Sequence, residues 1–248
     1  MGICPIDEDG SKAVHDRVRS ERHRLVRDGP RWTRDHEGDF QRVTLPERDC
    51  DLLRDLLVGE GVETIVEIGL AYGSSALAIG EALFAVPRKQ PLHVIIDPLQ
   101  ETAWSNVGWE LIRAAGLDAT SRLVLEPSSQ ALPGLVEQGF TADAAFVDGS
   151  HRFHEVFTDL YFLRKIVRPG GIVVLDDYWW PSVRTASHYF ESNMGWLVVH
   201  DVFDGGTTDR ATGLGRLRAL RLPDPSFEPS FEDFRPFGET SSNPGGAR

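Results

Sequence analysis

The sequence predicts one α/β domain built on a doubly wound, mostly parallel sheet of seven strands. Five short apolar segments lie between residues 64 and 176, and stretches long enough for helices separate them. Each segment is apolar along nearly its whole length, which is typical of strands that helices cover on both faces. Strands that alternate with helices form parallel sheets. The 248 residues are also enough to bury one large core.

Residues 1–60 are predicted to form a helical addition in front of the sheet. The charged, weakly amphipathic segment 11–28 is compatible with a helix, which the following loop ends. Segment 45–59 is predicted to be a second helix that stops at a glycine, because its leucines have the spacing of one apolar helical face. These leucines are Leu52, Leu53, Leu56 and Leu57.

The main domain is predicted over residues 61–222. Segments 196–203 and 213–222 are expected to add two strands, as a pair at one edge of the sheet. After residue 222 the periodicity is lost and Pro, Ser and Gly become frequent, which predicts an irregular tail over residues 223–248. The five core strands are predicted at residues 64–69, 92–97, 121–126, 143–148 and 171–176.

Acidic residues accompany the ends of all five predicted core strands. Four strands end in an acid, and the first carries one two positions before its final glycine. Ligands of open α/β sheets bind outside the carboxyl ends of the strands. We therefore expect one crevice rimmed by these acids, although some of them could instead cap the following helix. The five acids are Glu67, Asp97, Glu126, Asp148 and Asp176.

Composition restricts the class of partner. The formal net charge is −12 at pH 7, so nucleic acid and anionic membranes would repel the protein at long range. We therefore expect a small-molecule ligand, no nucleic acid and no membrane partner. Cys4 and Cys50 show no disulfide or metal-site spacing, and neither a secretory signal nor an apolar run near ~18 residues is present. These features predict a cytoplasmic protein, and a homo-oligomer is compatible with them.

A glycine turn follows the first predicted strand. Gly69 and Gly73 flank this turn before a helix that begins near Ser74, and glycines there allow close backbone approach to a nucleotide-like ligand. The dinucleotide fingerprint Gly-x-Gly-x-x-Gly is absent. Glu67 would repel a pyrophosphate but attract a cationic ligand. S-adenosylmethionine carries a positive sulfonium and a positive amino group, and it is the cofactor we expect.

Further residues are expected to contact this cofactor. Asp97 is placed to accept hydrogen bonds from two ribose hydroxyls, a role that would serve NAD equally well. Ser128 and Ser129, after the third strand, could line an adenine pocket, with capping of the next helix as the alternative for one of them. The predicted cofactor-binding set is Glu67, Gly69, Gly73, Ser75, Asp97, Ser128, Ser129 and Asp148.

Over residues 60–205 the sequence resembles the class I S-adenosylmethionine-dependent methyltransferases. The segments that carry the resemblance are VEIGLAYGSS, VIIDP, FVDGSH and PGGIVVLDDY. It is most similar to the branch with the macrocin-type sugar O-methyltransferases, and more distantly to catechol O-methyltransferase. The resemblance implies the fold and the cofactor, and it restricts the acceptor only loosely.

Asp148, Asp176 and Asp177 are predicted to meet at one rim of the sheet. Neighbouring carboxylates repel and raise at least one pKa, and a divalent cation removes that repulsion. Mg²⁺ prefers oxygen ligands and leaves positions open for substrate oxygens. The matching positions bind the metal in the resembled families, which implies these three residues as ligands. Because side chains alternate along a strand, the strand must end or turn at the adjacent pair. In the alternative, one aspartate caps a helix and another faces solvent.

His151 and Asp148 are the predicted catalytic residues. His151 opens a predicted helix, whose positive N-terminus disfavours imidazolium, so we expect a neutral and basic side chain. Catechol O-methyltransferase uses a lysine at the matching step, so the identity of the base stays open, and His154 is a second candidate. The metal would lower the pKa of an acceptor hydroxyl, and His151 would take its proton. Tyr178, Trp179 and Trp180 are expected either to wall the acceptor pocket or to make core or dimer contacts.

These features predict a Mg²⁺-dependent O-methyltransferase acting on a small molecule with neighbouring hydroxyls, such as a sugar of a natural product. One alternative is a metal-independent methyltransferase whose acids orient the acceptor. Another is a catalytically silent subunit that binds S-adenosylmethionine. An NAD-dependent oxidoreductase is disfavoured because the Gly-x-Gly pattern is missing.

Overall fold

The computed structural model describes residues 8–31, 39–85 and 90–237 of the chain. A seven-stranded sheet in the order β3-β2-β1-β4-β5-β7-β6 forms its centre, with β7 antiparallel to β5 and β6. The sheet confirms the predicted fold class, including the two late strands at one edge. The strands are β1 (Thr64–Ile68), β2 (Leu92–Ile96), β3 (Ser121–Val124), β4 (Ala142–Val147), β5 (Val167–Leu175), β6 (Leu197–Val198) and β7 (Arg218–Arg221).

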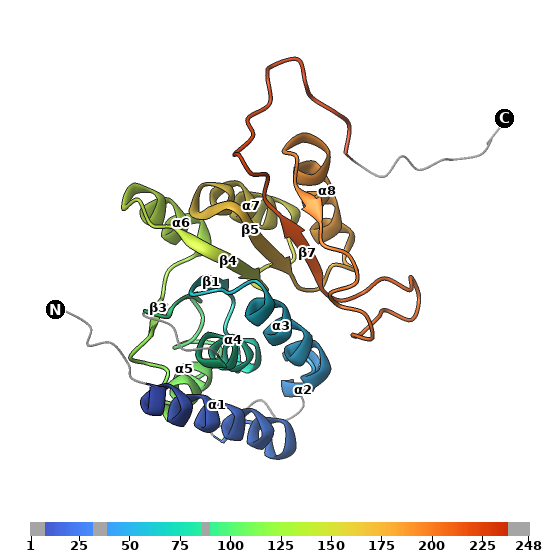
Figure 1. The fold of residues 1–248 in the computed structure, drawn as a ribbon. Coiled ribbons are helices and arrows are strands. Elements are labelled where there is room, and N and C mark those ends of the chain that lie inside the picture. The colour runs from blue at the N-terminus through green and yellow to red at the C-terminus, as the bar shows by residue number, and fades with distance from the viewer. Residues whose placement is uncertain (1–7, 32–38, 86–89, 238–248) are drawn as a thin grey trace.

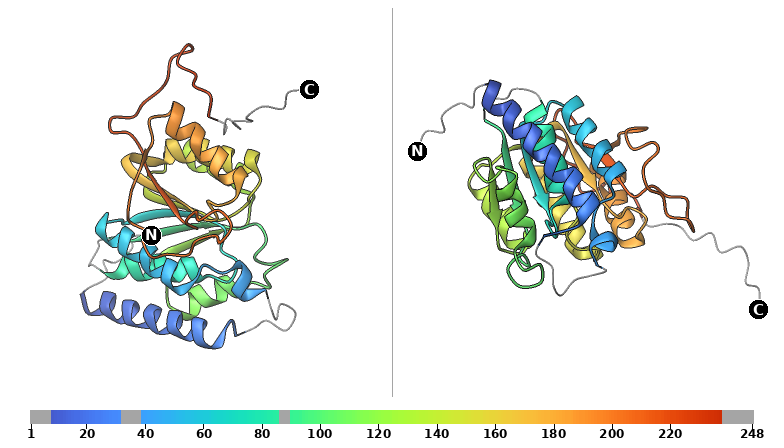
Figure 2. Two further views of the ribbon diagram at one scale, coloured as in Figure 1. Left: turned by 90° about the vertical axis from the view of Figure 1, so that its right-hand side faces the viewer. Right: turned by 90° about the horizontal axis from the view of Figure 1, so that it is seen from below.

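Helices cover both faces of this sheet (Figure 1). Helices α1, α3, α4 and α5 lie on one side, and α6, α7 and α8 lie on the other, so that three layers are visible in Figure 2. The helices are α1 (Glu8–Asp28), α2 (Phe40–Val43), α3 (Glu47–Gly59), α4 (Ser74–Ala85), α5 (Val107–Ala114), α6 (Ser128–Glu137), α7 (Phe153–Ile166) and α8 (Pro181–Asn193).

The sheet separates two buried clusters, because neighbouring side chains of a strand point to opposite faces. Phe146 of β4 packs in the cluster with α3, α4 and α5, whereas Val147 packs in the cluster with α6, α7 and α8. Val174 and Leu175 of β5 divide in the same way. Burial on both faces is the physical reason why these strands read as continuous apolar segments.

The N-terminal helices join the main core. Helix α1 packs along α4, and Val18 of α1 belongs to the same buried cluster as the sheet. Arg22 of α1 donates hydrogen bonds to Glu81 of α4 and, at 2.7 Å, to Asp51 of α3. A buried guanidinium therefore ties the first helix to two others.

The end of the described chain has no helix or strand after Arg221 of β7. Asn193 of α8 holds this segment, since its amide donates to the Arg235 carbonyl and accepts from the Arg235 N–H, at 2.9 and 2.6 Å. The remainder of the predicted tail, 238–248, lies outside the described residues, as does Cys4. Among the described helices, none is long and apolar enough to cross a membrane.

Candidate active site at the carboxyl ends of the strands

A cavity of about 940 Å³ opens where β1, β2 and β4 end. Ile68, Ile96 and Asp148, at or just after the ends of these strands, contribute to its wall. The predicted crevice at the carboxyl ends of the strands is therefore present. Its other lining residues include Gly69, Ala71, Asp97, Pro98, Ser128, Ser129, His151, His154, Glu155, Thr158, Asp159 and Trp180.

The turn after β1 approaches the end of β4 so closely that only glycine fits. Gly69 has φ +95°, and a Cβ atom there would lie 2.1 Å from the carbonyl oxygen of Asp148. Gly73, with φ +83°, ends the turn immediately before α4 and donates its N–H to the Leu70 carbonyl at 2.7 Å. Gly69 lines the cavity, whereas Gly73 shapes the turn without lining it.

Asp97 holds this turn in place. Its Oδ2 accepts hydrogen bonds from the N–H groups of Leu70 and Ala71, at 3.0 and 3.1 Å, and from the Gln100 amide at 2.9 Å. Its Oδ1 accepts from the Leu99 N–H at 2.8 Å. Asp97 lies on the cavity wall, as the sequence predicts. Both of its carboxylate oxygens already accept hydrogen bonds from within the protein, and its contact with a ribose stays a prediction.

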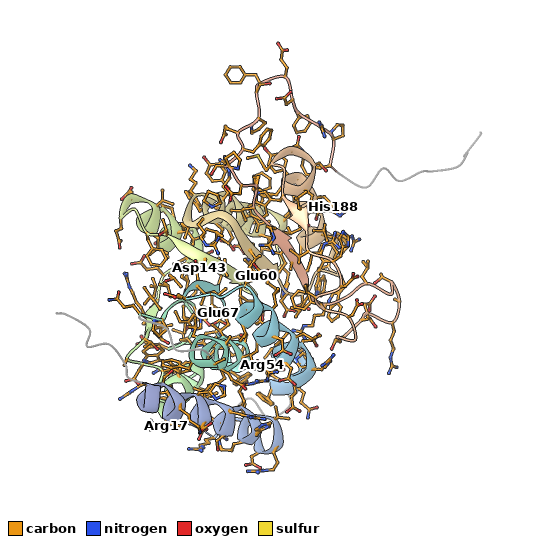
Figure 3. The ribbon with its side chains drawn as sticks, viewed as in Figure 1. Arg17, Arg54, Glu60, Glu67, Asp143 and His188 are labelled. Atoms are coloured by element: carbon orange, nitrogen blue, oxygen red, sulfur yellow. The ribbon has the colours of Figure 1, made fainter. Side chains whose placement is uncertain are left out.

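Glu67 and Ser75 lie behind the turn rather than on the cavity wall, contrary to the predicted direct contact with the cofactor. Val66 and Ile68 face α6 and α7, so the intervening Glu67 points to the opposite face, towards α4 (Figure 3). The Ser75 hydroxyl donates to its Oε1 at 2.6 Å, and His93 Nε2 lies 2.9 Å from its Oε2. Glu67 is fully buried in this network.

Ser128 and Ser129 line the cavity at the beginning of α6. The residue that precedes this helix is Pro127, so neither serine is its N-cap residue. Glu126, expected on the rim, is exposed and does not line the cavity. Its strand ends at Val124, and the chain has turned away from the sheet two residues later.

The three predicted carboxylates meet, and the chain turns where the sequence requires it. Asp177 has φ +50°, a left-handed conformation that interrupts strand geometry after β5. Loss of solvent raises the pKa of Asp148 well above its ordinary value, and the nearby charge of Asp176 raises it further. One ligand atom from each of Asp148, His151 and Asp177 lies within 4.8 Å of the others.

Asp176 forms an ion pair with Arg216, a residue that the sequence analysis did not identify. The guanidinium of Arg216 donates from Nε and Nη2 to the two oxygens of Asp176, each at 2.7 Å. Arg216 Nε also lies 3.7 Å from Asp177 Oδ1. The antiparallel pairing of β5 with β7, in which Leu175 faces Arg218, brings Arg216 beside the acidic pair. Of the predicted metal ligands, Asp148 and Asp177 therefore lie together beside His151, whereas both oxygens of Asp176 are paired with Arg216.

His151 is not the weakly protonated group that the sequence predicts. Its Nε2 lies 2.7 Å from Asp177 Oδ2, and this hydrogen bond raises the pKa of His151 above its ordinary value. Helix α7 begins only at Phe153, so the helix terminus acts more weakly than the direct carboxylate contact. The ring of Trp180 stacks beside the imidazole, with centroids 5.9 Å apart.

The three aromatic residues after the acidic pair have separate surroundings. Tyr178 is buried, and its hydroxyl lies 3.2 Å from His188 Nε2, so it belongs to the core. The ring of Trp179 lies against Arg216, 5.7 Å from the guanidinium carbon. Trp180 is half exposed and lines the cavity. Of the three, Trp180 is the one that can contact a ligand there.

Comparison with known proteins agrees with this architecture. A family model described as a methyltransferase domain matches residues 66–178. A curated protein of Arabidopsis thaliana named as a caffeoyl-CoA O-methyltransferase is 27% identical over 158 residues, which cover 64% of this chain and 65% of that protein. One of Dictyostelium discoideum with the same name is 26% identical over 132 residues, covering 52% and 53%. The chain thus spans less than two thirds of either curated relative.

Solved structures share the fold. An O-methyltransferase from Bacillus cereus, in complex with SAH, superposes with a TM-score of 0.57 at 13% identity, covering 85% of this chain and 90% of that chain. The O-methyltransferase TomG from Streptomyces achromogenes, in complex with SAM, superposes with a TM-score of 0.59 at 18% identity, covering 86% and 90%. The recognition of a methyltransferase domain from the sequence is confirmed. The macrocin-type branch stays a prediction.

Proposed function

We propose, from the methyltransferase domain over residues 66–178, that the protein transfers a methyl group from S-adenosylmethionine to a hydroxyl oxygen of a small molecule. The observation that carries this proposal is that one cavity is lined both by residues suited to the donor and by residues suited to the chemistry. One part contains Gly69, Asp97 and Ser128, the residue types expected around an adenosyl group, and another contains Asp148 and His151. The methyl donor and the acceptor can therefore bind next to each other in one cavity.

The donor atoms around Asp148 and Asp177 fit a divalent cation. Two carboxylates and an imidazole offer ligand atoms within 4.8 Å of one another, and carboxylate oxygens suit Mg²⁺. We assign Asp148 and Asp177 as the residues that would hold it, while Asp176 stays with Arg216. A bound dication would supply one chemical effect, which is to lower the pKa of the acceptor hydroxyl.

We assign His151 as the general base and Asp177 as the residue that orients it. When Nε2–H donates to Asp177 Oδ2, the other ring nitrogen, Nδ1, keeps a lone pair that can take a proton. The carboxylate also raises the pKa of His151 and so strengthens it as a base. In the reaction, the acceptor oxygen bonds to the methyl carbon, the carbon–sulfur bond breaks with its electron pair left on sulfur, and the hydroxyl proton passes to Nδ1.

The acceptor we propose is a small hydroxylated molecule with neighbouring oxygens. Trp180, beside His151 on the cavity wall, offers an apolar face against which a ring can lie. The net charge of −12 supports a small molecule rather than nucleic acid. TomG, which shares this fold, is an O-methyltransferase involved in tomaymycin synthesis.

Turnover assays on a panel of catechol, phenol and sugar acceptors test this proposal, with formation of S-adenosylhomocysteine as the readout. We expect product from at least one vicinal diol or catechol, and activity that Mg²⁺ increases and a chelator abolishes. Full activity in excess EDTA would instead support the metal-independent alternative. Binding of S-adenosylmethionine without turnover of any acceptor would support a non-catalytic subunit.

A further inference from the structure

Arg216 places a buried positive charge inside the acidic cluster. Its guanidinium donates to both oxygens of Asp176 at 2.7 Å, and its Nε lies 3.7 Å from Asp177 Oδ1. Asp177 belongs to the group of potential ligands that lie within 4.8 Å of one another, and Asp176 does not. The two aspartates are adjacent in the chain, so the guanidinium decides which of their carboxylates is left for a ligand.

The surrounding chain holds Arg216 in this position. The Arg216 N–H donates to the Thr207 carbonyl at 2.8 Å, and the Arg216 carbonyl accepts from the Tyr178 N–H at 2.9 Å. Thr207 is itself fixed, because its N–H donates to the buried carboxylate of Asp49 in α3 at 2.9 Å. The ring of Trp179 lies against the guanidinium. The positive charge is therefore held at the acids both from the loop before β7 and from α3.

A divalent cation could recruit Asp176 only by breaking this ion pair. The guanidinium of Arg216 would then stay buried without its two acceptors, and an unpaired buried charge is costly. The guanidinium would also repel a cation that binds a few ångströms away. The affinity of an oxygen-ligand site for its cation depends on the number of charged ligands. Both effects of Arg216 therefore weaken cation binding at the cluster.

We propose that Arg216 is a positioning residue that sets the affinity of this site for a divalent cation. By holding Asp176, it limits the cation to two carboxylates, those of Asp148 and Asp177. This inference rests on the proposed function, because it takes the acidic cluster as the cation site. A site with two carboxylates binds its cation weakly and leaves more coordination positions to water and to the oxygens of an acceptor.

Titration with Mn²⁺, followed by the EPR signal of the free ion, tests the inference without an acceptor or a methyl donor. Mn²⁺ accepts the same oxygen ligands as Mg²⁺. We expect Arg216→Met to bind Mn²⁺ at least about tenfold more tightly than the wild-type protein does, because a repelling charge is removed and Asp176 becomes a third carboxylate. If Arg216 served only to stabilise the fold, its loss would weaken Mn²⁺ binding or leave it unchanged.

The double variant Arg216→Met/Asp176→Asn gives a test that does not depend on the folding of the single variant, because it leaves no unpaired buried charge. We expect it to bind Mn²⁺ within about threefold of the wild-type affinity, since the same two carboxylates remain. Asp148→Asn should weaken binding at least about tenfold, because it removes one of them. Arg168→Met is the matched control and should keep the wild-type affinity, since Arg168 pairs with Asp143 near the amino ends of β4 and β5.

The contrary outcomes are distinct from one another. If the double variant loses as much affinity as Asp148→Asn, Asp176 is a ligand in the wild-type protein, and the inference is wrong while the cation site stands. If Arg216→Met folds and binds Mn²⁺ no more tightly than the wild-type protein, the guanidinium does not limit the site. If Arg168→Met gains as much affinity, overall charge is responsible. If neither the wild-type protein nor any variant binds Mn²⁺, the cation site of the proposed function is itself wrong.

Discussion

Arg216 gives the strongest test of how the acidic cluster is stabilised. Its guanidinium and the carboxylate of Asp176 are both buried and share two hydrogen bonds of 2.7 Å. Removing one partner of such a pair leaves an uncompensated charge in a low-dielectric interior, which typically costs about 3–5 kcal/mol. We therefore expect Arg216→Met to lose that amount of unfolding free energy in metal-free buffer. The double variant Arg216→Met/Asp176→Asn should recover most of it, because no buried charge remains unpaired.

Urea denaturation at neutral pH measures both variants, with and without millimolar MgCl₂. Magnesium should restore part of the lost stability to Arg216→Met, because the freed Asp176 carboxylate can join Asp148 and Asp177 around the cation. Arg168→Met serves as the control, since Arg168 pairs with Asp143 at the surface and such pairs contribute about 1 kcal/mol or less. The reasoning is refuted if Arg216→Met is as stable as the control, or if the double variant is no more stable than the single one.

Three further predictions concern the base, a buried acid and the glycine turn. His151→Gln should reduce kcat by about 10²–10⁴ and change the melting temperature much less than Arg216→Met does, because Gln can still donate to Asp177. The exposed His154→Gln should keep wild-type kcat, and equal losses of kcat in the two variants would contradict our choice of base. In the folded protein the pKa of Asp159 is raised from 3.8 to about 7, so the unfolded chain loses this proton at a lower pH than the folded chain does. The free energy of unfolding should therefore fall by on the order of 4 kcal/mol as the pH rises from 4 to 7. Asp159→Asn should flatten that part of the stability profile measured by denaturation across pH, and an unchanged slope would exclude Asp159 as its source. Gly69→Ala should strongly destabilise the fold and abolish S-adenosylhomocysteine binding, because its Cβ would lie 2.1 Å from a main-chain oxygen at φ +95°. Gly139→Ala, at φ +65° with open space around its Cβ, should cost only about 1 kcal/mol of unfolding free energy and leave binding unchanged.

The sheet was predictable because its signal is local. Segments such as 172–175 are apolar at every position, and burial on both faces by helices leaves that pattern in the sequence itself. The glycine turn was predictable for a similar reason, since Gly69 and Gly73 have positive φ, a conformation that residues with a side chain rarely adopt. Even the bend at the acidic pair followed from strand geometry, and Asp177 has φ +50°.

Side-chain partners across the fold were not predictable. Arg216 lies 40 residues after Asp176 in the chain, and only the register of β5 against β7 makes them neighbours. In the sequence, Glu67 is an acid beside a glycine turn, and nothing local tells which face of the sheet it points to. In the structure its neighbours Val66 and Ile68 face α6 and α7, so Glu67 points to the opposite face. Asp159 looks like one more acid on an amphipathic helix until the packing of α7 on α6 buries it.

The sequence by itself thus determined the order of the elements, the turn and the rim at which acids gather, because these depend on backbone conformation and on side-chain spacing along a single element. Only the tertiary structure decided which charges neutralise each other. Coulombic and hydrogen-bond energies depend on distances of a few ångströms between residues far apart in the chain. The pairing of Asp176 with Arg216 and of His151 with Asp177 is the result of that packing.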